Sequence, residues 1–391
     1  MNTPPRILIV DDEPYNVDYL QQELSDRGFE LTAAFDGKEA LEKIRAESPD
    51  LVLLDIMMPV MDGFAALEQV KADAATRDIP VIVISASSDL KSVVKGIQKG
   101  AEDYLPKPFE PVLLHARISA SLERKRLRDQ EQMYLKGLER ELEIGREIQK
   151  GFLPADLPRA EGWEIAVYFK AAREVAGDFY DAFHLPDGML GLVIADVCGK
   201  GVGAALFMTL FRSLIRAAST AEFFAQETDA QNPIAERLER SLCLANDYIA
   251  KTHGRTGMFA TVFFGILDPK SGLLTYINAG HEPPVIAKAN GAQERLPKTG
   301  LAVGLLAGFK FAQKTHQIER GDLFFAFTDG APESKNPQGE FFERERLIAL
   351  LDSKNGSAAA LLNRIETQLL AHIADADQFD DITLLAARRL E

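Results

Sequence analysis

Aspartates follow apolar runs at two places in the N-terminal third of the chain. Asp11 and Asp12 come directly after residues 7–10, and Asp55 comes directly after residues 51–54. Because the carboxyl ends of neighbouring parallel strands meet at one edge of a sheet, these three carboxylates are expected to converge. Three like charges repel unless a cation lies among them, and Mg²⁺ is the hard divalent ion that carboxylate oxygens suit. The pattern therefore predicts a magnesium site.

A hydroxyl and an ammonium follow the next two apolar runs. Ser85 comes after residues 81–84, and Lys107 comes shortly after residues 103–105. Together they offer the hydrogen-bond donor and the positive charge that a phosphoryl group requires. Taken singly, Asp12 could cap a helix, Lys107 could be a solvated loop residue and Ser85 an ordinary strand end. Their joint occurrence at successive strand ends favours a site that takes up a phosphoryl group.

The elements that must position these groups alternate between strand and helix over residues 6–120. The three apolar quartets have the composition of strands buried on both faces of a sheet. Between them, apolar residues recur at helical spacing, as at Val17, Leu20 and Leu24. This alternation predicts an α/β fold with a doubly wound parallel sheet.

Residues 6–120 resemble a two-component receiver domain of the flavodoxin-like fold. The resemblance rests on Asp11-Asp12, on Asp55 in LLDIMMPVMDG, on Ser85 followed by alanine, on Tyr104 and on Lys107-Pro108. It implies that Asp55 is the phosphoacceptor, which takes the phosphoryl group from a sensor histidine kinase by nucleophilic attack.

The same resemblance implies a role for each remaining residue. Asp12, Asp55 and the main-chain carbonyl of Met57 would hold Mg²⁺, and Asp11 would help through water. Ser85 and Lys107 would bind phosphoryl oxygens, and Tyr104 would change rotamer together with Ser85 on activation.

A charged segment without proline follows, over residues 117–152. Leu135, Leu138 and Leu142 keep the spacing of a coiled-coil seam, but Gly145 and Gln149 occupy the next two seam positions. The segment is either a solvated connecting helix or a dimerising helix. We therefore expect a receiver domain over residues 1–120, a helical linker over 121–153 and a second domain over 154–391.

The second domain is rich in strands. We expect strands at 163–170, 189–196, 259–267, 273–279, 323–328 and 382–387, and helices at 204–217, 234–249 and 358–372. Strands that neighbour strands, with helices in separate blocks, predict two sheets packed face to face with helices outside, an α-β-β-α sandwich.

Acidic clusters recur in this domain beside glycines, at Asp178, Asp196, Asp329 and the pair Asp380-Asp381. The lack of cysteine pairs or a histidine cluster argues against zinc, whereas oxygen ligands suit Mg²⁺ or Mn²⁺. Two such ions about 3.5–4 Å apart can lower the pKa of a shared water and direct it at phosphorus. Alternatively, Asp329 marks a turn and Asp196 caps a helix.

Two further motifs in this domain are less specific. The sequence GKGVG, around Lys200, does not match the phosphate-loop pattern GxxxxGK[ST]. His281 in NAGHEPP is either a turn or core residue or a group on the substrate side.

These motifs, with NAGHEPP and GMFAT, resemble the PPM (PP2C-like) serine/threonine phosphatases of the bacterial sporulation and stress-response branch. The resemblance implies two Mn²⁺ or Mg²⁺ ions bridged by Asp196, with the Val197 carbonyl on one of them. Asp329 and Asp380 would complete the other site, and Asp178 would bind through water or help to recruit a further ion. Asp381 is the less favoured ligand because the first acid of the motif binds in this family.

Composition limits the partners and the compartment. The chain has 44 basic and 59 acidic residues and a formal net charge of −15, which disfavours binding to nucleic acid or an anionic membrane. Two cysteines, the lack of an apolar run of about 18 residues and the lack of a signal-peptide pattern predict a cytoplasmic protein.

The sequence thus predicts a response regulator that dephosphorylates a phosphoprotein. By resemblance, the substrate is an anti-sigma-factor antagonist of the STAS type, and the chain forms a homodimer through receiver and linker. The alternative is a non-catalytic adaptor that uses the phosphatase fold only to bind a partner.

Overall fold

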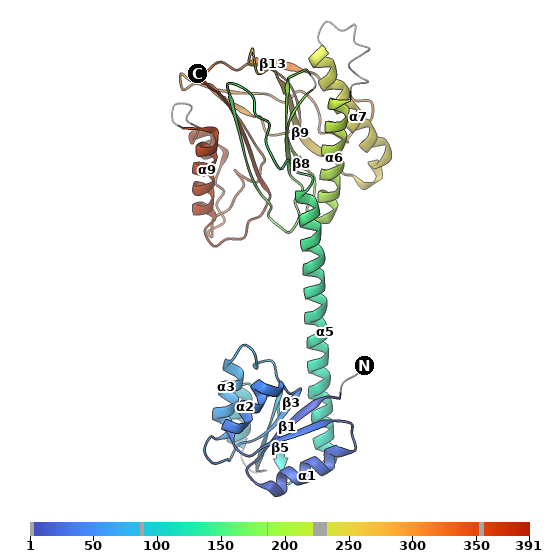
Figure 1. Ribbon diagram of the computed structural model, residues 1–391, viewed down its shortest axis with the longest axis vertical. Helices are drawn as coiled ribbons and strands as arrows, with labels where there is room; N and C mark the ends of the chain where they lie inside the picture. Colours follow the sequence, from blue (N-terminus) through green and yellow to red (C-terminus); the bar gives the residue numbers. More distant parts are fainter. Residues whose placement is uncertain (1–3, 87–89, 186, 222–232, 352–355) are drawn as a thin grey trace. The chain divides into compact units, whose positions relative to one another are not determined.

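The structure of the protein is a computed structural model that describes residues 4–86, 90–185, 187–221, 233–351 and 356–391. It divides into two compact units, Met1–Glu139 and Arg140–Glu391 (Figure 1).

The first unit contains a five-stranded parallel sheet in the order β2-β1-β3-β4-β5. Its strands are β1 (Arg6–Val10), β2 (Glu30–Ala34), β3 (Leu51–Asp55), β4 (Val81–Ala86) and β5 (Asp103–Lys107). Its helices are α1 (Pro14–Ser25), α2 (Gly37–Glu47), α3 (Gly63–Ala72), α4 (Leu90–Gln98) and the start of α5 (Pro111–Lys150). The predicted doubly wound parallel sheet is confirmed.

The apolar quartets are buried on both faces, as expected. Leu8 and Leu54 pack into one cluster with residues of α2 and α3, while Ile7 and Leu53 pack into another with residues of α1 and α5. Strand β2 has no apolar quartet and was not predicted, because it is an edge strand with half-buried side chains.

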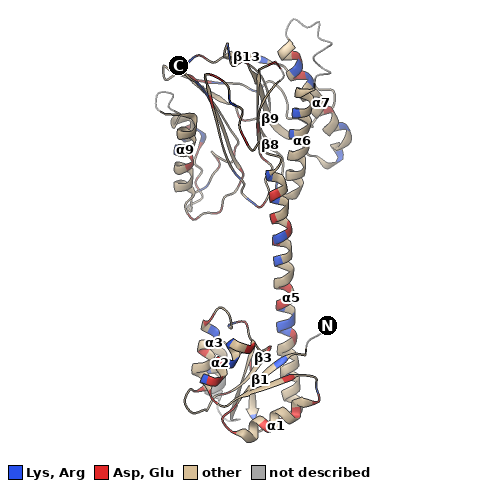
Figure 2. Ribbon diagram, viewed as in Figure 1, with Lys and Arg blue, Asp and Glu red and all other residues tan. Residues whose placement is uncertain are grey.

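Helix α5 changes character along its length. Leu114 and Ile118 in its first turns lie in the core of the first unit, and charged side chains alternate along its exposed middle part (Figure 2). Of the predicted seam, Leu135 and Leu138 are exposed and Leu142 is half-buried. The boundary between the two units lies within this helix.

The second unit contains two five-stranded sheets, ordered β13-β10-β9-β8-β7 and β12-β11-β14-β15-β6. The strands of the first sheet are β7 (Phe179–His184), β8 (Leu190–Val197), β9 (Ala260–Leu267), β10 (Leu273–Ala279) and β13 (Lys314–Gln317). Those of the second are β6 (Trp163–Lys170), β11 (Val285–Ala287), β12 (Gln293–Arg295), β14 (Leu323–Phe327) and β15 (Ile382–Arg389). The helices are α6 (Val202–Thr220), α7 (Pro233–Thr252), α8 (Arg344–Ala349) and α9 (Ala358–Ile373), with a short 3₁₀ turn at Gly254–Thr256.

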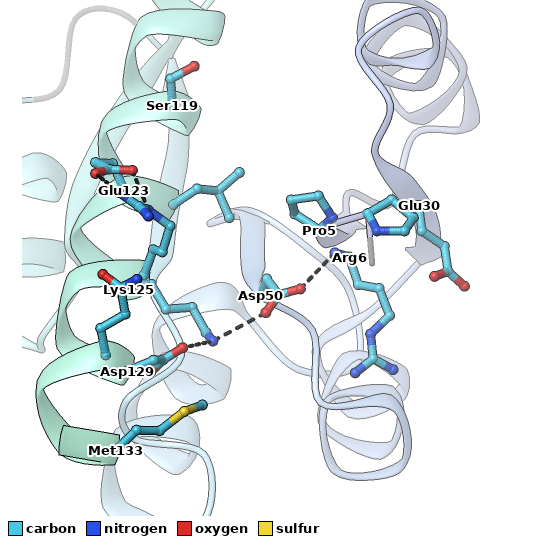
Figure 3. Close-up of a pocket in the computed structure, with 13 residues that line it drawn as sticks. Pro5, Arg6, Glu30, Asp50, Ser119, Glu123, Lys125, Asp129 and Met133 are labelled. Carbon is cyan, nitrogen blue, oxygen red and sulfur yellow. Dashed lines mark hydrogen bonds and ion pairs between the residues drawn. The ribbon is translucent and has the colours of Figure 1, made fainter. Parts of the chain in front are cut away.

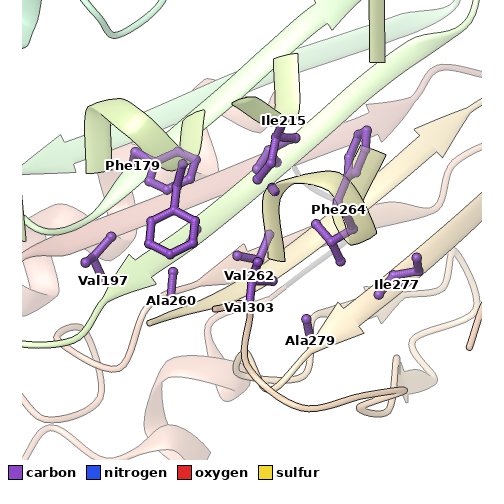
Figure 4. Close-up of a cluster of buried hydrophobic side chains, with 14 of the residues drawn as sticks. Phe179, Val197, Ile215, Ala260, Val262, Phe264, Ile277, Ala279 and Val303 are labelled. Carbon is purple, nitrogen blue, oxygen red and sulfur yellow. The ribbon is translucent and has the colours of Figure 1, made fainter. Parts of the chain in front are cut away.

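Three apolar clusters define the layers of this unit. One lies between α6 and α7 and the first sheet, where Phe179, Val197 and Ile215 gather with Val262 and Phe264 (Figure 4). A second joins the facing sides of the two sheets, and a third joins the second sheet to α8 and α9. The predicted α-β-β-α sandwich is confirmed.

Helix α6 is long and apolar enough to cross a membrane by length and composition alone. Its apolar character has another physical cause in this fold, because Met208, Phe211 and Ile215 are buried in the cluster beneath it.

The strands that sequence reasoning missed in this unit are β7, β11, β12 and β13. The last three have three or four residues each, and the side chains of β12 are all exposed. Such short segments carry too few positions for a periodic signal.

Candidate functional site

The carboxyl edge of the parallel sheet brings the first set of predicted residues together. In the register of β1 with β3, Val10 pairs with Leu54, so the residues that follow them, Asp11 and Asp55, become neighbours. The Lys107 ammonium lies 2.7 Å from a carboxylate oxygen of Asp11 and 2.7 Å from one of Asp55. All three predicted groups therefore share one site.

Burial sets the electrostatics of this site. It raises the pKa of the Asp55 carboxyl, and the ammonium of Lys107 only partly offsets that effect. Burial alone would lower the Lys107 pKa, but hydrogen bonds and charge from Asp11 and Asp55 outweigh it and raise the value. Lys107 thus stays charged between two carboxylates.

The remaining receiver residues surround this centre. The Met57 backbone N–H donates to Asp55 Oδ2 at 2.9 Å, and Asp12 is half-buried beside Asp11. Ser85 is buried on β4 and pairs with Pro106 of β5, next to Lys107. The ring of Tyr104, on β5, lies under the Arg117 guanidinium, 5.1 Å from ring centre to carbon.

A groove of about 740 Å³ lies at the opposite, amino-terminal end of the strands, between them and α5 (Figure 3). Its charged side chains neutralise one another, as where Lys125 contacts Asp50 at 3.2 Å and Asp129 at 2.6 Å. It shares no lining residue with the carboxylate site.

In the second unit, two glycines bring the acidic motifs together by close approach. A Cβ at Gly330, after Asp329, would lie 1.9 Å from the carbonyl oxygen of Asp381. A Cβ at Gly177, before Asp178, would lie 3.0 Å from the carbonyl oxygen of Val197. Glycine is required at both positions because a side chain would push these segments apart.

Asp178 is the deepest member of this group. Its Oδ2 accepts hydrogen bonds from the hydroxyls of Thr328 and Thr383, both at 2.7 Å. Burial, and then repulsion from Asp196 and Asp381, raises its pKa well above the usual value. Thr328 directly follows β14, and Thr383 is the second residue of β15. The second sheet therefore holds Asp178, which directly precedes β7 of the other sheet.

Asp380 and Asp381 are adjacent in sequence but differ in environment. Asp381 accepts from the backbone N–H groups of Ala172 at 2.8 Å and Gly177 at 2.7 Å, so it fixes the loop before Asp178. Asp380 instead contacts the ammonium of Lys200 at 2.7 Å. Asp381 thus accepts hydrogen bonds from backbone N–H groups, whereas Asp380 forms an ion pair with the flexible side chain of a lysine.

Asp196 and Asp329 are two further, half-buried acids, and both have raised pKa values. Burial, followed by repulsion from Asp329, Asp380 and Asp381, raises the pKa of Asp196 to about 7. Burial, followed by repulsion from Glu333, Asp380 and Glu282, raises the pKa of Asp329 to about 6. Burial is thus the main cause of both raised pKa values, and neighbouring acids add to it.

This donor set fits divalent cations. The acids present oxygen ligands and repel one another, which is the arrangement that a hard cation relieves. Within the described ranges, however, no three Asp, Glu, His or Cys side chains lie close enough together to hold a metal ion. In this structure the Asp380 carboxylate contacts the ammonium of Lys200 instead.

Comparison with known families identifies the second unit. A family model described as Stage II sporulation protein E (SpoIIE) matches residues 186–390, more than half of the chain. The chain belongs to this family. A second model, the response regulator receiver domain, matches residues 7–119. The chain therefore joins a receiver domain to a SpoIIE domain, and both predicted resemblances are confirmed.

Individual relatives agree with this assignment. Protein IcfG of Synechocystis sp. is 42% identical over 262 residues, which cover 64% of this chain and 41% of IcfG. The DNA-binding response regulator MtrA of Mycolicibacterium smegmatis is 41% identical over 119 residues, 30% of this chain and 51% of MtrA. The chain thus spans about half or less of these relatives.

Among solved structures, the PP2C domain of SiaA from Pseudomonas aeruginosa superposes with a TM-score of 0.52. It is 19% identical, and the match covers 65% of this chain and 98% of that domain. This likeness shows that the SpoIIE domain has the PP2C-like fold.

Sequence reasoning missed several residues of the SpoIIE domain site. Thr328 and Glu333 lie next to or close to Asp329, and Thr383 lies close to Asp380-Asp381, but none of the three was assigned a role from the sequence. Lys200 lies between two glycines and four positions after Asp196, which is a signal for a role in this site, although GKGVG does not match a phosphate loop.

For His281 the structure favours the core interpretation. The side chain is buried, its Nδ1 lies 2.9 Å from the hydroxyl of Thr261, and burial lowers its pKa to about 3. We therefore interpret the neutral His281 ring as a structural residue near the end of β10 and not as a group that binds substrate.

Proposed function

We propose that the chain is a response regulator whose SpoIIE domain hydrolyses phosphoserine or phosphothreonine on another protein. The observation that supports this most is that Asp178, Asp196 and Asp329 of the PP2C-like fold are buried or half-buried and have raised pKa values, in part because they repel one another and Asp380. Buried like charges are costly, so their retention in one site is expected where a cation is bound.

We assign these residues to a pair of Mn²⁺ or Mg²⁺ ions. Asp196 would bridge both ions, the Val197 carbonyl would bind one, and Asp329 and Asp380 would bind the other. Asp178 would act through water. Such ions supply a water of lowered pKa that can attack phosphorus. Asp381 would hold the loop that carries Asp178 rather than bind directly.

The receiver would control this activity through Asp55. A histidine kinase would donate the phosphoryl group, Asp11, Asp12, Asp55 and the Met57 carbonyl would hold Mg²⁺, and Ser85, Lys107 and Tyr104 would sense the phosphoryl group. The ammonium of Lys107, held between Asp11 and Asp55, supports this assignment because the phosphoryl group needs that charge.

The end of α5 supplies a contact through which such control could act. The Gln149 side chain donates to the Ala176 carbonyl at 2.7 Å and accepts from the Ala176 N–H at 2.9 Å. The next residues, Gly177 and Asp178, belong to the acidic site. Gln149, which interrupts the predicted seam, is therefore tied to the site, and a shift of the helix end would move the Asp178 loop.

The partner and the assembly follow from the resemblance. The substrate would be a phosphorylated anti-sigma-factor antagonist of the STAS type, in the cytoplasm. The chain would form a homodimer through the receiver and the linker, where Leu135 and Leu138 are exposed.

The test is hydrolysis of p-nitrophenyl phosphate and of a phosphorylated STAS protein with Mn²⁺. Asp196→Asn should lower the rate by about a hundredfold or more, because losing an outer-sphere partner alone costs 10–100-fold. Mass spectrometry of the STAS protein reports the substrate independently of the small-molecule assay.

The second candidate is the non-catalytic adaptor. The retained acid set speaks against it, because a binding scaffold does not require buried, mutually repelling carboxylates. An adaptor would bind the STAS protein but release no phosphate, and Asp196→Asn would leave both properties unchanged.

A further inference from the structure

Lys200 is a cation placed among the acids of the SpoIIE domain. It lies in the loop between β8, which carries Asp196, and α6. Gly199 and Gly201 flank it with φ angles of 86° and 78°, and nothing lies within 4 Å of where their Cβ atoms would be. A loop with a glycine on each side allows the lysine side chain to take more than one direction.

Three contacts hold the ammonium in this structure. It lies 2.7 Å from Asp380 Oδ2, donates to the Phe379 carbonyl at 2.6 Å and stands 3.8 Å from the centre of the Phe379 ring. The Lys200 side chain is still 30% exposed, and Phe379 is 55% exposed. The ammonium is therefore bound at the rim of the site and remains within reach of solvent.

The charge around this position is strongly negative. Asp329 and Asp380 repel the charge on Asp196, and Lys200 acts on it in the opposite direction. Glu333 and Glu282 add to the repulsion on Asp329. A phosphoryl group brings up to two further negative charges, so a substrate needs a positive group at the same rim.

Two bonding partners would compete for Asp380. A divalent cation on that carboxylate would repel the ammonium beside it, so Lys200 would lose its present partner when the site is loaded. Its flexible four-carbon stem lets the charge move without a backbone change. The nearest new anion would then be the phosphoryl group of the substrate.

We propose that Lys200 binds the phosphoryl group of the substrate after its release from Asp380. This inference rests on the proposed phosphatase function and adds a substrate-binding residue to it. Lys200 would lower the KM for phosphorylated substrates, and it would also occupy Asp380 while the site holds no metal.

The test uses the full chain and inorganic phosphate as the probe. Lys200→Met, Lys200→Arg and the control Lys251→Met are compared, since Lys251 forms an exposed ion pair with Asp247 within α7. Titration calorimetry measures Mn²⁺ binding first and phosphate binding to the Mn²⁺-loaded chain second. Hydrolysis of p-nitrophenyl phosphate gives KM and kcat separately.

Lys200→Met should weaken phosphate binding about 10- to 100-fold, the usual range for loss of a hydrogen bond to a charged group, and raise KM by a similar factor. Mn²⁺ should bind as tightly as in the unaltered chain or more tightly, because a competing cation is gone. Lys200→Arg should retain part of the phosphate affinity, and Lys251→Met should change nothing.

Unchanged phosphate affinity and KM in a folded Lys200→Met, with the unaltered chain active, would overturn this inference and leave the phosphatase function standing. Loss of folding in both Lys200→Met and Lys200→Arg would assign Lys200 a structural role and would also overturn it. An unaltered chain that neither binds Mn²⁺ nor hydrolyses the substrate would overturn both proposals together.

Discussion

The carboxylate sites of the receiver and of the SpoIIE domain differ in how far Lys107 and Lys200, respectively, balance their charge. In the receiver, Lys107 contacts two buried acids at 2.7 Å each. In the SpoIIE domain, Lys200 forms an ion pair with Asp380 at 2.7 Å, while Asp196 and Asp329 have pKa values of about 7 and about 6. The receiver lysine thus offsets part of the charge of two acids, whereas Lys200 forms its ion pair with one.

The two sites also differ in construction. The receiver residues sit at the ends of neighbouring parallel strands, so backbone hydrogen bonding alone places them together. The SpoIIE acids come from both sheets and from the loops between them, and close packing at Gly177 and Gly330 joins them. A site of the second kind is more sensitive to movement of a single loop.

The largest expected effect is that one variant loses phosphoryl uptake alone and another loses hydrolysis alone. Asp55→Asn should abolish phosphoryl uptake from acetyl phosphate, because the attacking carboxylate is gone. Hydrolysis of p-nitrophenyl phosphate should then stay at the rate of the unphosphorylated chain. Asp196→Asn should leave phosphoryl uptake unchanged and lower the hydrolysis of p-nitrophenyl phosphate about a hundredfold or more.

Phosphate-affinity gels and the hydrolysis assay measure the two activities on the same samples. If Asp55→Asn reduced hydrolysis as strongly as Asp196→Asn does, the two sites would not be independent, and the comparison between them would fail.

A second expectation concerns Asp178, which is buried and strongly repelled by its neighbours. In the presence of EDTA at pH 8, Asp178→Asn should raise the free energy of unfolding by about 0.5–2 kcal/mol, the usual gain from removing an unfavourable group. The amide oxygen can still accept from Thr328 and Thr383. Hydrolysis with Mn²⁺ should fall about 10- to 100-fold.

Urea unfolding measures the change in stability, and the rate of Mn²⁺-dependent hydrolysis measures the change in activity. Asp178→Ala serves as the control, because it leaves both hydroxyls without their acceptor and should destabilise the chain. A metal-free Asp178→Asn chain that is less stable than the parent would show that repulsion is not the main influence on this acid.

The same contrast explains what could be predicted from the sequence. The receiver fold and the Asp11, Asp55 and Lys107 cluster were predictable, because apolar quartets mark the strands and strand order makes their ends adjacent. For the SpoIIE domain, the sandwich and the acidic motifs were predictable, but β11, β12 and β13 were too short to carry a pattern.

Contacts between distant segments were not predictable. Gln149 appeared as a defect in a seam, and only the packed structure shows that it binds the backbone of Ala176. The ion pair of Lys200 with Asp380 likewise joins residues that are 180 positions apart in the sequence. Local patterns do not record such pairs.

A smaller expectation is a pH dependence of stability to which Asp196 and Asp329 contribute. The folded-state pKa values of Asp196 and Asp329 lie above the usual value of 3.8, so the folded chain binds more protons than the unfolded chain between about pH 4 and pH 7. Stability without metal should therefore fall as the pH rises through that window. In Asp196→Asn the fall should be smaller by about 1–2 kcal/mol.

Urea midpoints in EDTA at pH 5 and pH 8 measure this difference between the two chains. Saturating Mn²⁺ should reverse the trend in the parent, because cations bind the ionised acids and protons compete with them. Equal slopes for parent and variant in EDTA would contradict the repulsion attributed to Asp196.

The smallest expected effects come from helix caps and show whether the two units unfold separately. Asp62 accepts from the Ala65 N–H at 2.7 Å at the start of α3, and Ser357 accepts from the Ala360 N–H at 3.0 Å at the start of α9. Asp62→Ala and Ser357→Ala should each cost about 1 kcal/mol. Calorimetry should show one transition moving in each variant, the receiver transition for Asp62→Ala and the SpoIIE transition for Ser357→Ala. If both variants shifted the same single transition, the receiver and SpoIIE domains would unfold as one cooperative unit, and charge balance at one site would then affect the stability of the other.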